Sequence, residues 1–380
     1  MEWAAFVFLA MAILVHITTA AMAAVRIRRA SARMPPANVP PTSIVRPVCG
    51  LDPFDNITLG STFRVEPESR LELLFCAAHE RDAAVPLVRR LIAERPDVDA
   101  RLLLGDDRST SNPKLNNVIK GWDAARHGWV VIADSNVLMP PDYLGRLFAA
   151  MADDTGLVCS PPIGSRPLSF WAEVECAFLN TYQARWQLAS DSAGLGFAQG
   201  KSMLWRREVL DRAGGIRALG IEIAEDAAAT KVVRRDGLRV RLVGAPFEQP
   251  LGVRSCREVL ARQVRWARLR RATFPGFYAP EVLTSSVGAM AAATVAAPLM
   301  GLEPGLAAGL VAALWFGSEA VLAKAAGWHL NLASPLAWMV RDVVLPAIWL
   351  KGWIGDGFTW RGNDMTVADA GVAAGEQGQP

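Results

Sequence analysis

The sequence contains few cysteines, and they show no paired spacing. Its five cysteines are odd in number and lie far apart along 380 residues: Cys49, Cys76, Cys159, Cys176 and Cys256. Zinc sites and disulfide frameworks place cysteines at characteristic intervals, so neither is predicted. We expect reduced thiols, which are typical of a protein that faces the cytosol.

Charged side chains are absent from long stretches of the chain. With 52% hydrophobic residues and a mean hydropathy of +0.21, the chain is too apolar for an ordinary soluble enzyme, and membrane segments explain this most simply. Residues 3–25 carry no charge, with His16 as their only ionisable side chain, and about 20 apolar residues suffice to cross the hydrocarbon core. A cleaved signal peptide would carry its basic residues before a shorter apolar region. The sequence therefore favours an uncleaved membrane anchor over residues 1–34.

Four arginines follow this apolar tract directly: Arg26, Arg28, Arg29 and Arg33. Arginines beside a membrane span mark its cytoplasmic side. We therefore expect the N-terminus to face away from the cytoplasm and residues 35–256 to form a cytosolic domain. The predicted location is the inner (cytoplasmic) membrane, which the chain crosses more than once.

A second apolar region runs from residue 282 to residue 328 and is interrupted by a Glu-Pro-Gly turn. Its length fits two spans joined by this turn, over about residues 282–302 and 304–324. Glu319 lies inside the second of these spans, so it needs a partner within the helix bundle.

The next apolar segment, residues 335–354, has Arg341 and Asp342 at its centre and Pro346 beyond them. A charged pair is expensive in lipid and a proline interrupts a helix, which favours a re-entrant or interfacial segment. A third span with a buried ion pair is the alternative, and the sequence leaves both open. Residues 281–356 as a whole are expected to form transmembrane or re-entrant helices.

The net charge is +3, and the positive excess is local. Six arginines crowd just ahead of the second apolar region: Arg257, Arg262, Arg265, Arg268, Arg270 and Arg271. A basic segment next to a membrane meets anionic lipid headgroups more often than nucleic acid, and each Lys or Arg contributes about 1 kcal/mol there. We therefore predict an interfacial helix over residues 257–280 and no nucleic-acid partner.

Between residues 70 and 250, short runs of Val, Leu and Ile alternate with helical patterns, which is typical of an α/β domain with a parallel sheet. The pattern predicts strands over residues 71–77, 101–104 and 129–133, with helices over 84–94 and 113–127 between them. Asp82 and Asp134 each follow a predicted strand, at the sheet edge where open α/β sheets bind ligands. We expect these two carboxylates to lie at one edge of the sheet.

Asp134 ends a buried apolar run, so its carboxylate is expected at the mouth of the sheet. A hard divalent cation needs oxygen ligands, and Mg²⁺ takes one or two carboxylates together with substrate phosphates. Asp134 is therefore the candidate metal ligand, although turn chemistry at a strand end is the alternative for the sequence Asp-Ser-Asn. For Asp82 the alternative role is capping of the helix that starts near Ala84.

Glu225 and Asp226 precede residues 227–233, which are strong helix formers. The pair is expected in the first turn of a helix, whose positive end favours the ionised form of a carboxylate. An ionised aspartate near a hydroxyl acts as a general base. Asp226 is therefore the candidate catalytic residue.

Gln263, Arg265 and Trp266 lie together on the predicted interfacial helix. A tryptophan near a membrane surface is often simply an anchor. Glutamine and arginine beside it can hold phosphate oxygens, and arginine does so bidentately. We assign these three residues to contacts with a diphosphate and an acceptor.

These residues together resemble the ceramide glucosyltransferase family, glycosyltransferase family 21, including its bacterial lipid hexosyltransferase branch, over about residues 45–362. The aspartates Asp82, Asp134 and Asp226 and the Gln-x-Arg-Trp motif match its markers. Further likeness lies in short segments: Gly50-Leu51-Asp52-Pro53, Asn112-Pro113-Lys114-Leu115-Asn116-Asn117, Gly200-Lys201-Ser202-Met203 and Trp360-Arg361-Gly362.

The resemblance implies a GT-A nucleotide-sugar domain, with a mixed, mostly parallel sheet, and N- and C-terminal membrane helices. It implies transfer of a hexose, glucose or galactose, from a UDP-sugar to a lipid hydroxyl with inversion. Asp82 would face the uracil and ribose, Asp226 would be the base, and Mg²⁺ or Mn²⁺ would bind at Asp134. Many GT-A proteins have a second aspartate two positions further on, whereas this chain has Asn136, whose amide oxygen is a weaker ligand.

The acceptor stays open between ceramide, diacylglycerol and a hopanoid or other lipid. A non-catalytic membrane scaffold that keeps a sugar-nucleotide domain is the alternative from another class, and the intact site residues argue against it. A polysaccharide synthase would normally need more spanning helices. Residues 357–380 are expected to form a tail that is disordered from about residue 367, because Ala, Gly and Gln dominate it.

Overall fold

The computed structural model describes residues 1–31, 36, 38–67, 70–106, 108–360 and 363–367. The chain forms two compact units. The helical unit comprises residues 1–29, 163–189 and 251–355, and the sheet unit comprises residues 30–162, 190–250 and 356–380.

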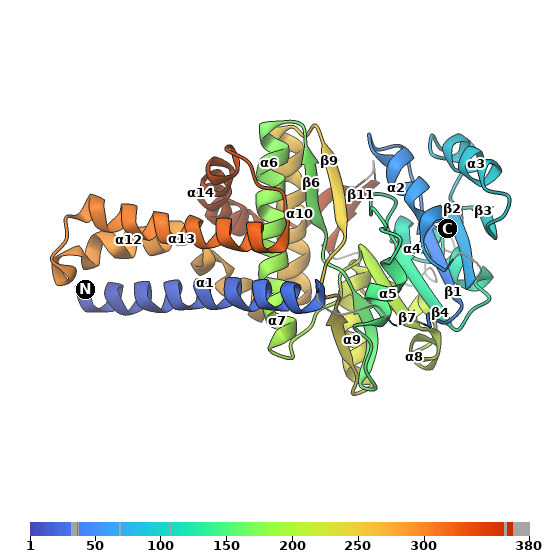
Figure 1. The fold of residues 1–380 in the computed structure, drawn as a ribbon, viewed down its shortest axis with the longest axis horizontal. Coiled ribbons are helices and arrows are strands. Elements are labelled where there is room, and N and C mark those ends of the chain that lie inside the picture. Colours follow the sequence, from blue (N-terminus) through green and yellow to red (C-terminus); the bar gives the residue numbers. More distant parts are fainter. Residues whose placement is uncertain (32–35, 37, 68–69, 107, 361–362, 368–380) are drawn as a thin grey trace, which may run out of the picture. The chain divides into compact units, whose positions relative to one another are not determined.

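The sheet unit contains a seven-stranded sheet in the order β3-β2-β1-β4-β7-β5-β8 (Figure 1). Its strands are β1 (Thr42–Pro47), β2 (Leu71–Ala77), β3 (Ala100–Leu104), β4 (Trp129–Ala133), β5 (Thr155–Cys159), β7 (Ser202–Arg206) and β8 (Arg239–Leu242). All neighbours pair in parallel except β7, which is antiparallel to both β4 and β5. The predicted mixed, mostly parallel sheet is therefore confirmed.

Helices join and cover these strands. They are α2 (Asp55–Ser61), η1 (Thr62–Arg64), α3 (Val85–Glu94), α4 (Pro113–Ala124), α5 (Tyr143–Phe148), α8 (Arg207–Arg212), η4 (Ile216–Ile221) and α9 (Glu225–Arg235). The strands predicted over residues 71–77 and 129–133 are confirmed to the residue, and the helices predicted over 84–94 and 113–127 differ from α3 and α4 only at their ends. A hairpin of β10 (Gly357–Trp360) and β11 (Asn363–Thr366) completes the unit, where the sequence predicted a tail.

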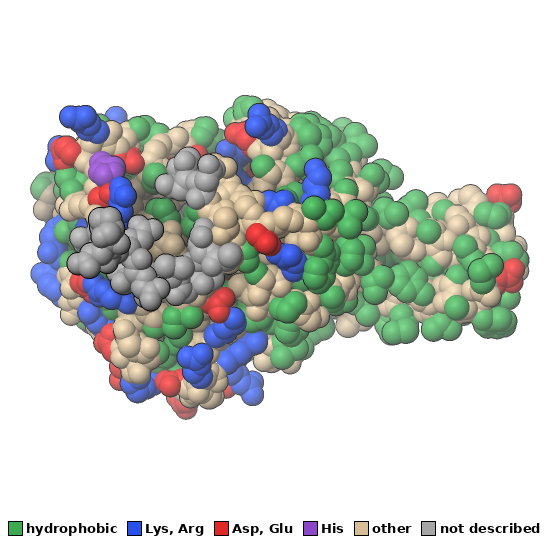
Figure 2. Space-filling model, turned by 180° about the vertical axis from the view of Figure 1, so that it is seen from behind, with side chains coloured by type: hydrophobic (Ala, Val, Ile, Leu, Met, Phe, Trp, Pro, Cys, Tyr) green, Lys and Arg blue, Asp and Glu red, His purple; other side chains and the backbone are tan. Residues whose placement is uncertain are grey.

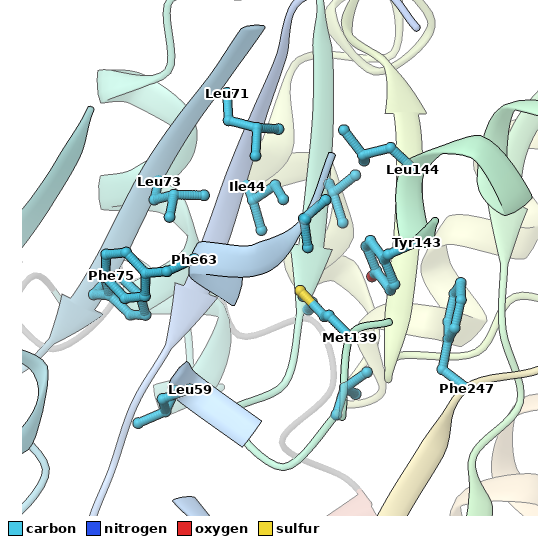
Figure 3. Close-up of a cluster of buried hydrophobic side chains, with 14 of the residues drawn as sticks. Ile44, Leu59, Phe63, Leu71, Leu73, Phe75, Met139, Tyr143, Leu144 and Phe247 are labelled. Atoms are coloured by element: carbon cyan, nitrogen blue, oxygen red, sulfur yellow. The ribbon is translucent and has the colours of Figure 1, made fainter. Parts of the chain in front are cut away.

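The two faces of the sheet bury different side chains, because successive residues of a strand point to opposite faces. On one face Ile44 and Phe75 join a core that includes residues of α2, α3 and α5 (Figure 3). On the other face Val45 and Cys76 meet α4 at Gly121, where a Cβ would lie 2.8 Å from the sulfur of Cys76. Glycine is therefore the residue that lets α4 approach the sheet this closely.

The helical unit consists mainly of helices. They are α1 (Glu2–Ser31), α6 (Phe170–Ala177), the π-helical η3 (Phe178–Ala184), α7 (Arg185–Ser192), α10 (Cys256–Thr273), α11 (Pro275–Tyr278), η5 (Ala279–Thr284), α12 (Ser286–Ala296), η6 (Ala297–Met300), α13 (Pro304–Ala326) and α14 (Ser334–Trp353). Strand β6 (Ile163–Pro167) pairs with β9 (Glu248–Gly252), through which the chain returns to this unit.

Among the described residues, two helices are long and apolar enough to cross a membrane: residues 2–30 and 304–326. Residues 275–284 and 286–300 reach that length only if they are counted as one span, bent by 52°. Figure 2 shows an almost continuous hydrophobic surface at the right of the view, over the helical unit, with acidic side chains at its far end. The two apolar helices lie where the sequence predicted the N-terminal anchor and the span near 304–324, and the span predicted over about 282–302 falls within the bent segment.

Helix α14 continues through Pro346, so the interruption expected there is wrong. A proline removes one backbone hydrogen bond, and a helix in a packed bundle can continue past it with a local adjustment. The partner required for Glu319 is present, because its carboxylate pairs with the buried guanidinium of Arg341.

Candidate active site

Asp134 lies at the carboxyl edge of the sheet, directly after β4. Its Oδ1 lies 2.7 Å from Nζ of Lys114, and its Oδ2 lies 2.9 Å from Nζ of Lys201. Lys114 comes from the first turn of α4, and Lys201 directly precedes β7, the antiparallel neighbour of β4. Sheet topology therefore brings two ammonium groups to one carboxylate.

The ammonium group of Lys114 joins Asp134 to the start of α9. Its Nζ lies 2.6 Å from Oε1 of Glu225 and donates a hydrogen bond of 2.9 Å to the carbonyl of Gly200. Glu225 also accepts a hydrogen bond of 3.1 Å from the side chain of Asn112, which caps α4. Two carboxylate oxygens and one carbonyl oxygen thus surround this ammonium group.

Asp226 belongs to the same cluster. A Cβ placed on Gly200 would lie 3.1 Å from Oε1 of Glu225, 3.4 Å from Nζ of Lys114 and 3.8 Å from Oδ2 of Asp226. The absence of a side chain at Gly200 therefore leaves room for these groups to converge. Asp226 Oδ1 accepts a hydrogen bond of 2.8 Å from the backbone N–H of Ala227, as expected at a helix start.

Burial and charge give the two aspartates opposite pKa shifts. Burial alone would raise the pKa of Asp134, but Lys114 and Lys201 outweigh it and hold that pKa well below its usual range. For Asp226, burial and then the carboxylate of Glu225 raise the pKa to about 6, against the smaller opposing effect of Lys114. The sequence predicted that the helix start would favour the ionised form of Asp226; the backbone N–H of Ala227 does lower its pKa, but burial and Glu225 outweigh that effect.

Arg46, in the middle of β1, holds the loop that carries Asp134. Its buried Nη2 donates to the carbonyls of Asp134, Ser135 and Val137 at 2.7, 2.8 and 3.0 Å. One guanidinium therefore holds the backbone of the loop that follows the candidate metal ligand. A charge in an otherwise apolar strand is the sequence signal that points to such a role.

Asp82 lies beyond β2 and ties two loops together. Both of its carboxylate oxygens accept from the backbone N–H of Gly50, at 3.0 and 3.1 Å, and Oδ1 accepts from Ala84 at 2.8 Å. The N-cap residue of α3 is Ala84, without a side-chain cap, so Asp82 is not the N-cap that was considered for it, although its carboxylate holds the backbone just before this helix. Gly50 has a φ of +67°, which a side chain would make unfavourable.

Gln263, Arg265 and Trp266 belong to the helical unit, on α10. Gln263 is buried and its Oε1 accepts a hydrogen bond of 3.0 Å from Gln183. Trp266 packs against a small apolar cluster of α6, η3 and β9, and Arg265 is half-buried. Helix α10 starts with a capping box in which Ser255 and Glu258 bond each other's backbone.

Most arginines of the basic run are bonded within the helical unit. Arg262 pairs with the buried Glu175, and Arg270 pairs with Glu281. Arg268 donates to the carbonyl of Ile354, and Arg271 to that of Trp353. The sequence predicted that this run meets anionic lipid headgroups, and these contacts show that several of its arginines also pack α10 onto its neighbours. Arg361 and Gly362, like Arg33, lie outside the described residues.

The donor set at Asp134 suits a divalent cation that takes further ligands from a substrate. Its Oδ1 is buried and forms an ion pair with Lys114. Asn136 adds an amide oxygen nearby, which accepts from Lys201 at 3.1 Å. The described part of the chain has no group of three His, Cys, Asp or Glu side chains that could hold a metal ion. Asp134 therefore fits as one ligand, with phosphate oxygens as the others.

Sequence reasoning singled out Asp134 and Asp226 but gave no role to three side chains around them. Lys114 and Lys201 stood only as members of short matching segments, and Glu225 was expected to interact with the helix dipole alone. An isolated lysine in a polar segment carries no signal of its partner. The pairing appears only once β4, β7 and α9 are assembled.

A family described as Glycosyl transferase family 21 matches residues 7–373. Ceramide glucosyltransferase 1 of Caenorhabditis elegans is 27% identical over 344 residues, which cover 89% of this chain and 74% of that protein. The ceramide glucosyltransferase of Komagataella phaffii is 29% identical over 295 residues, covering 62% of this chain and 58% of that protein.

One solved structure is similar over nearly the whole chain. The mannosyltransferase PcManGT from Pyrobaculum calidifontis, in complex with GDP-Man and Mn²⁺, gives a TM-score of 0.50 at 18% identity, covering 92% of this chain and 97% of that one. At this identity the likeness concerns the fold alone. It confirms the predicted GT-A arrangement.

Proposed function

Since this chain belongs to glycosyl transferase family 21, we propose that it transfers a hexose, glucose or galactose, from a UDP-sugar to the hydroxyl of a membrane lipid. The proposed acceptor is ceramide or diacylglycerol, and the product is a glycolipid with inverted anomeric configuration. The names of the similar curated proteins support the lipid acceptor.

The observation that carries this proposal is the environment of Asp226. Its carboxyl group has a pKa raised to about 6, and it lies in the cluster that also contains Lys114 and Glu225. A general base works best when its pKa is close to the working pH. Asp226 is suited to accept a proton near neutrality, which Asp134, with its depressed pKa, is not.

The proposed reaction is a single displacement. Asp226 takes the proton of the acceptor hydroxyl while the oxygen of that hydroxyl forms a bond to the anomeric carbon. The bond from this carbon to the diphosphate oxygen breaks on the opposite side, so UDP leaves and the configuration inverts. Such a step needs no covalent enzyme intermediate.

Positive groups of the chain stabilise the leaving UDP in this proposal. Lys114 and Lys201 are the cations of the sheet unit at Asp134, and Asp82 would bind the nucleoside. Gln263, Arg265 and Trp266 would contact the diphosphate and the acceptor. A divalent cation held by Asp134, Mg²⁺ or Mn²⁺, would neutralise charge that develops on the diphosphate.

The proposed orientation in the membrane rests on the arginines at the end of α1. Arg28 and Arg29 lie in the last turn of this apolar helix, which supports a cytosolic sheet unit in a multi-pass protein of the inner membrane. Anionic lipid headgroups are the proposed partners of the exposed part of the segment 257–271. The presence of helices that could span a membrane supports access to a lipid acceptor from the bilayer surface.

The proposal is tested with the full chain in detergent or membranes. Labelled UDP-glucose, UDP-galactose and UDP-glucuronic acid are incubated with vesicles that contain ceramide or diacylglycerol, and products are separated by lipid chromatography. We expect a glycolipid from UDP-glucose or UDP-galactose, with inverted configuration by NMR. UDP binding without transfer to either lipid would instead support a scaffold or another acceptor, such as a hopanoid.

A further inference from the structure

The unusual feature of the sheet unit is that both oxygens of Asp134 already have cationic partners. Lys114 lies 2.7 Å from one oxygen and Lys201 lies 2.9 Å from the other. All three side chains are largely shielded from solvent, with 12% of Lys114 and 20% each of Lys201 and Asp134 exposed. A cation that binds Asp134 must therefore take the place of at least one ammonium group.

We propose that Lys114 and Lys201 are exchangeable counter-ions of Asp134, which release it to a divalent cation and turn to the diphosphate of the donor. This inference rests on the proposed function. Its consequence is that cation and donor bind as a cooperative pair, each strengthening the other.

The first argument is the charge count of the cluster. Asp134, Glu225 and Asp226 carry three negative charges when ionised, and Lys114 and Lys201 carry two positive ones. The cluster is thus close to neutral before any ligand arrives. The two ammonium groups repel a divalent cation at Asp134 unless negative charge comes with it, and a nucleoside diphosphate supplies that charge.

The second argument is the position of Lys201. Its Nζ contacts Oδ2 of Asp134 at 2.9 Å and Oδ1 of Asn136 at 3.1 Å. These are the two side-chain oxygens that follow β4 and suit a hard cation. Movement of this one side chain therefore uncovers both oxygens together.

The third argument concerns the partners that an ammonium group and Asp134 need once their ion pair is broken. A shielded ammonium group without an anion is costly, and so is the carboxylate that it abandons. Lys114 keeps Glu225 and the carbonyl of Gly200 as acceptors if it loses Asp134. Diphosphate oxygens and the cation replace the lost partners on both sides, so the exchange is favourable only when both ligands are present.

The test measures Mn²⁺ and UDP binding on the full-length protein, without sugar transfer. Free Mn²⁺ is followed by electron paramagnetic resonance, and UDP binding by calorimetry with and without Mn²⁺. In the unmodified protein we expect Mn²⁺ alone to bind weakly. UDP should raise its affinity by the same factor as Mn²⁺ raises that of UDP, because such coupling is reciprocal.

Lys201→Met removes one counter-ion and keeps the length of the side chain. We expect it to bind Mn²⁺ alone at least about tenfold more tightly than the unmodified protein, because a neighbouring positive charge has been removed, and to bind UDP less tightly. Lys201→Arg should keep the weak Mn²⁺ binding. The matched control is Lys231→Met. Lys231 lies on α9 and pairs with Glu222, so its removal should change neither the affinity for Mn²⁺ nor that for UDP.

Unchanged or weaker Mn²⁺ binding in Lys201→Met would overturn the exchange, as would independent binding of Mn²⁺ and UDP in the unmodified protein. If thermal unfolding shows that Lys201→Met does not fold, the exchange is tested by the mutual effect of Mn²⁺ and UDP on each other's affinity in the unmodified protein. Absence of UDP binding under all conditions would overturn the proposed donor. The two failures are therefore distinguishable.

Discussion

Glu319 of α13 and Arg341 of α14 form a buried, bidentate ion pair within the helical unit. Nη2 of Arg341 lies 2.9 Å from Oε1 of Glu319, and Nη1 lies 3.0 Å from Oε2. Nε of Arg341 also donates to Asp342 at 2.8 Å, and Nη1 donates to Thr181 of η3 at 2.9 Å. One guanidinium thus joins three helical segments of this unit.

Arg341→Met should destabilise the helical unit strongly. It leaves the carboxylates of Glu319 and Asp342 buried without their cation, and breaking a buried pair in this way costs about 3–5 kcal/mol. We expect a much lower midpoint of thermal unfolding in detergent.

Two further variants separate charge from packing. Adding Glu319→Gln and Asp342→Asn to Arg341→Met removes both orphaned charges and should recover much of the lost stability. Lys324→Met, at an exposed position of α13, is the matched control and should leave the midpoint nearly unchanged. Equal midpoints for Arg341→Met and Lys324→Met would contradict a structural role for the pair.

Asp226→Asn should abolish most turnover while keeping the donor bound. The amide cannot accept the proton of the acceptor hydroxyl, and loss of a general base typically costs about 10²-fold or more in kcat. Sugar transfer is measured on lipid vesicles and UDP affinity by calorimetry. Near-normal turnover in this variant would exclude Asp226 as the base.

Turnover should fall as the pH falls through about 6, the pKa of Asp226. The proton-bound form of this carboxyl group predominates below that pH and cannot act as a base, whereas the ionised form predominates above it. The slope of log kcat against pH should be close to one on the acidic side. A flat profile between pH 5 and 8 would mean that another step or another group limits the reaction.

Glu225→Gln should move this acidic limb to lower pH. The negative charge of Glu225 raises the pKa of Asp226, so its removal lowers that pKa and keeps the base ionised in more acidic solution. The control is Glu222→Gln. This variant also removes a carboxylate close to the start of α9, but one that pairs with Lys231. A limb that moves to higher pH, or moves equally in both variants, would contradict this coupling.

Gly121→Ala should destabilise the sheet unit. The added methyl group would collide with Val45 and lie 2.8 Å from the sulfur of Cys76, and overpacking of a core typically costs about 1–3 kcal/mol. Gly128→Ala is the control, because no atom lies within 4 Å of its added Cβ. The check is the denaturant midpoint of each variant, and equal midpoints would show that α4 can shift without cost.

Strand positions and membrane character follow from local patterns of this sequence. Residues 73–77 of β2 and the whole of β4 are continuously apolar because both faces of these strands are buried, and such runs are visible without a structure. Residues 3–25 are recognisable for a similar reason, since lipid demands an uninterrupted apolar surface. The start of α9 at Glu225 is likewise a local matter of helix propensity and acidic residues in the first turn.

Pairing between side chains that are distant in the sequence could not be predicted from local patterns. The need of Glu319 for a cation is evident from its apolar surroundings, but its choice of Arg341 depends on how α13 and α14 pack. The same holds for Lys114 and Lys201, which meet at Asp134 because β7 pairs antiparallel with β4 and α4 begins beside it. The pKa of Asp226 depends on that assembly too, because burial and the nearby Glu225 raise it against the opposing effect of Lys114. Local sequence sets which residues must be buried or paired, whereas long-range packing sets their partners and thereby their charge.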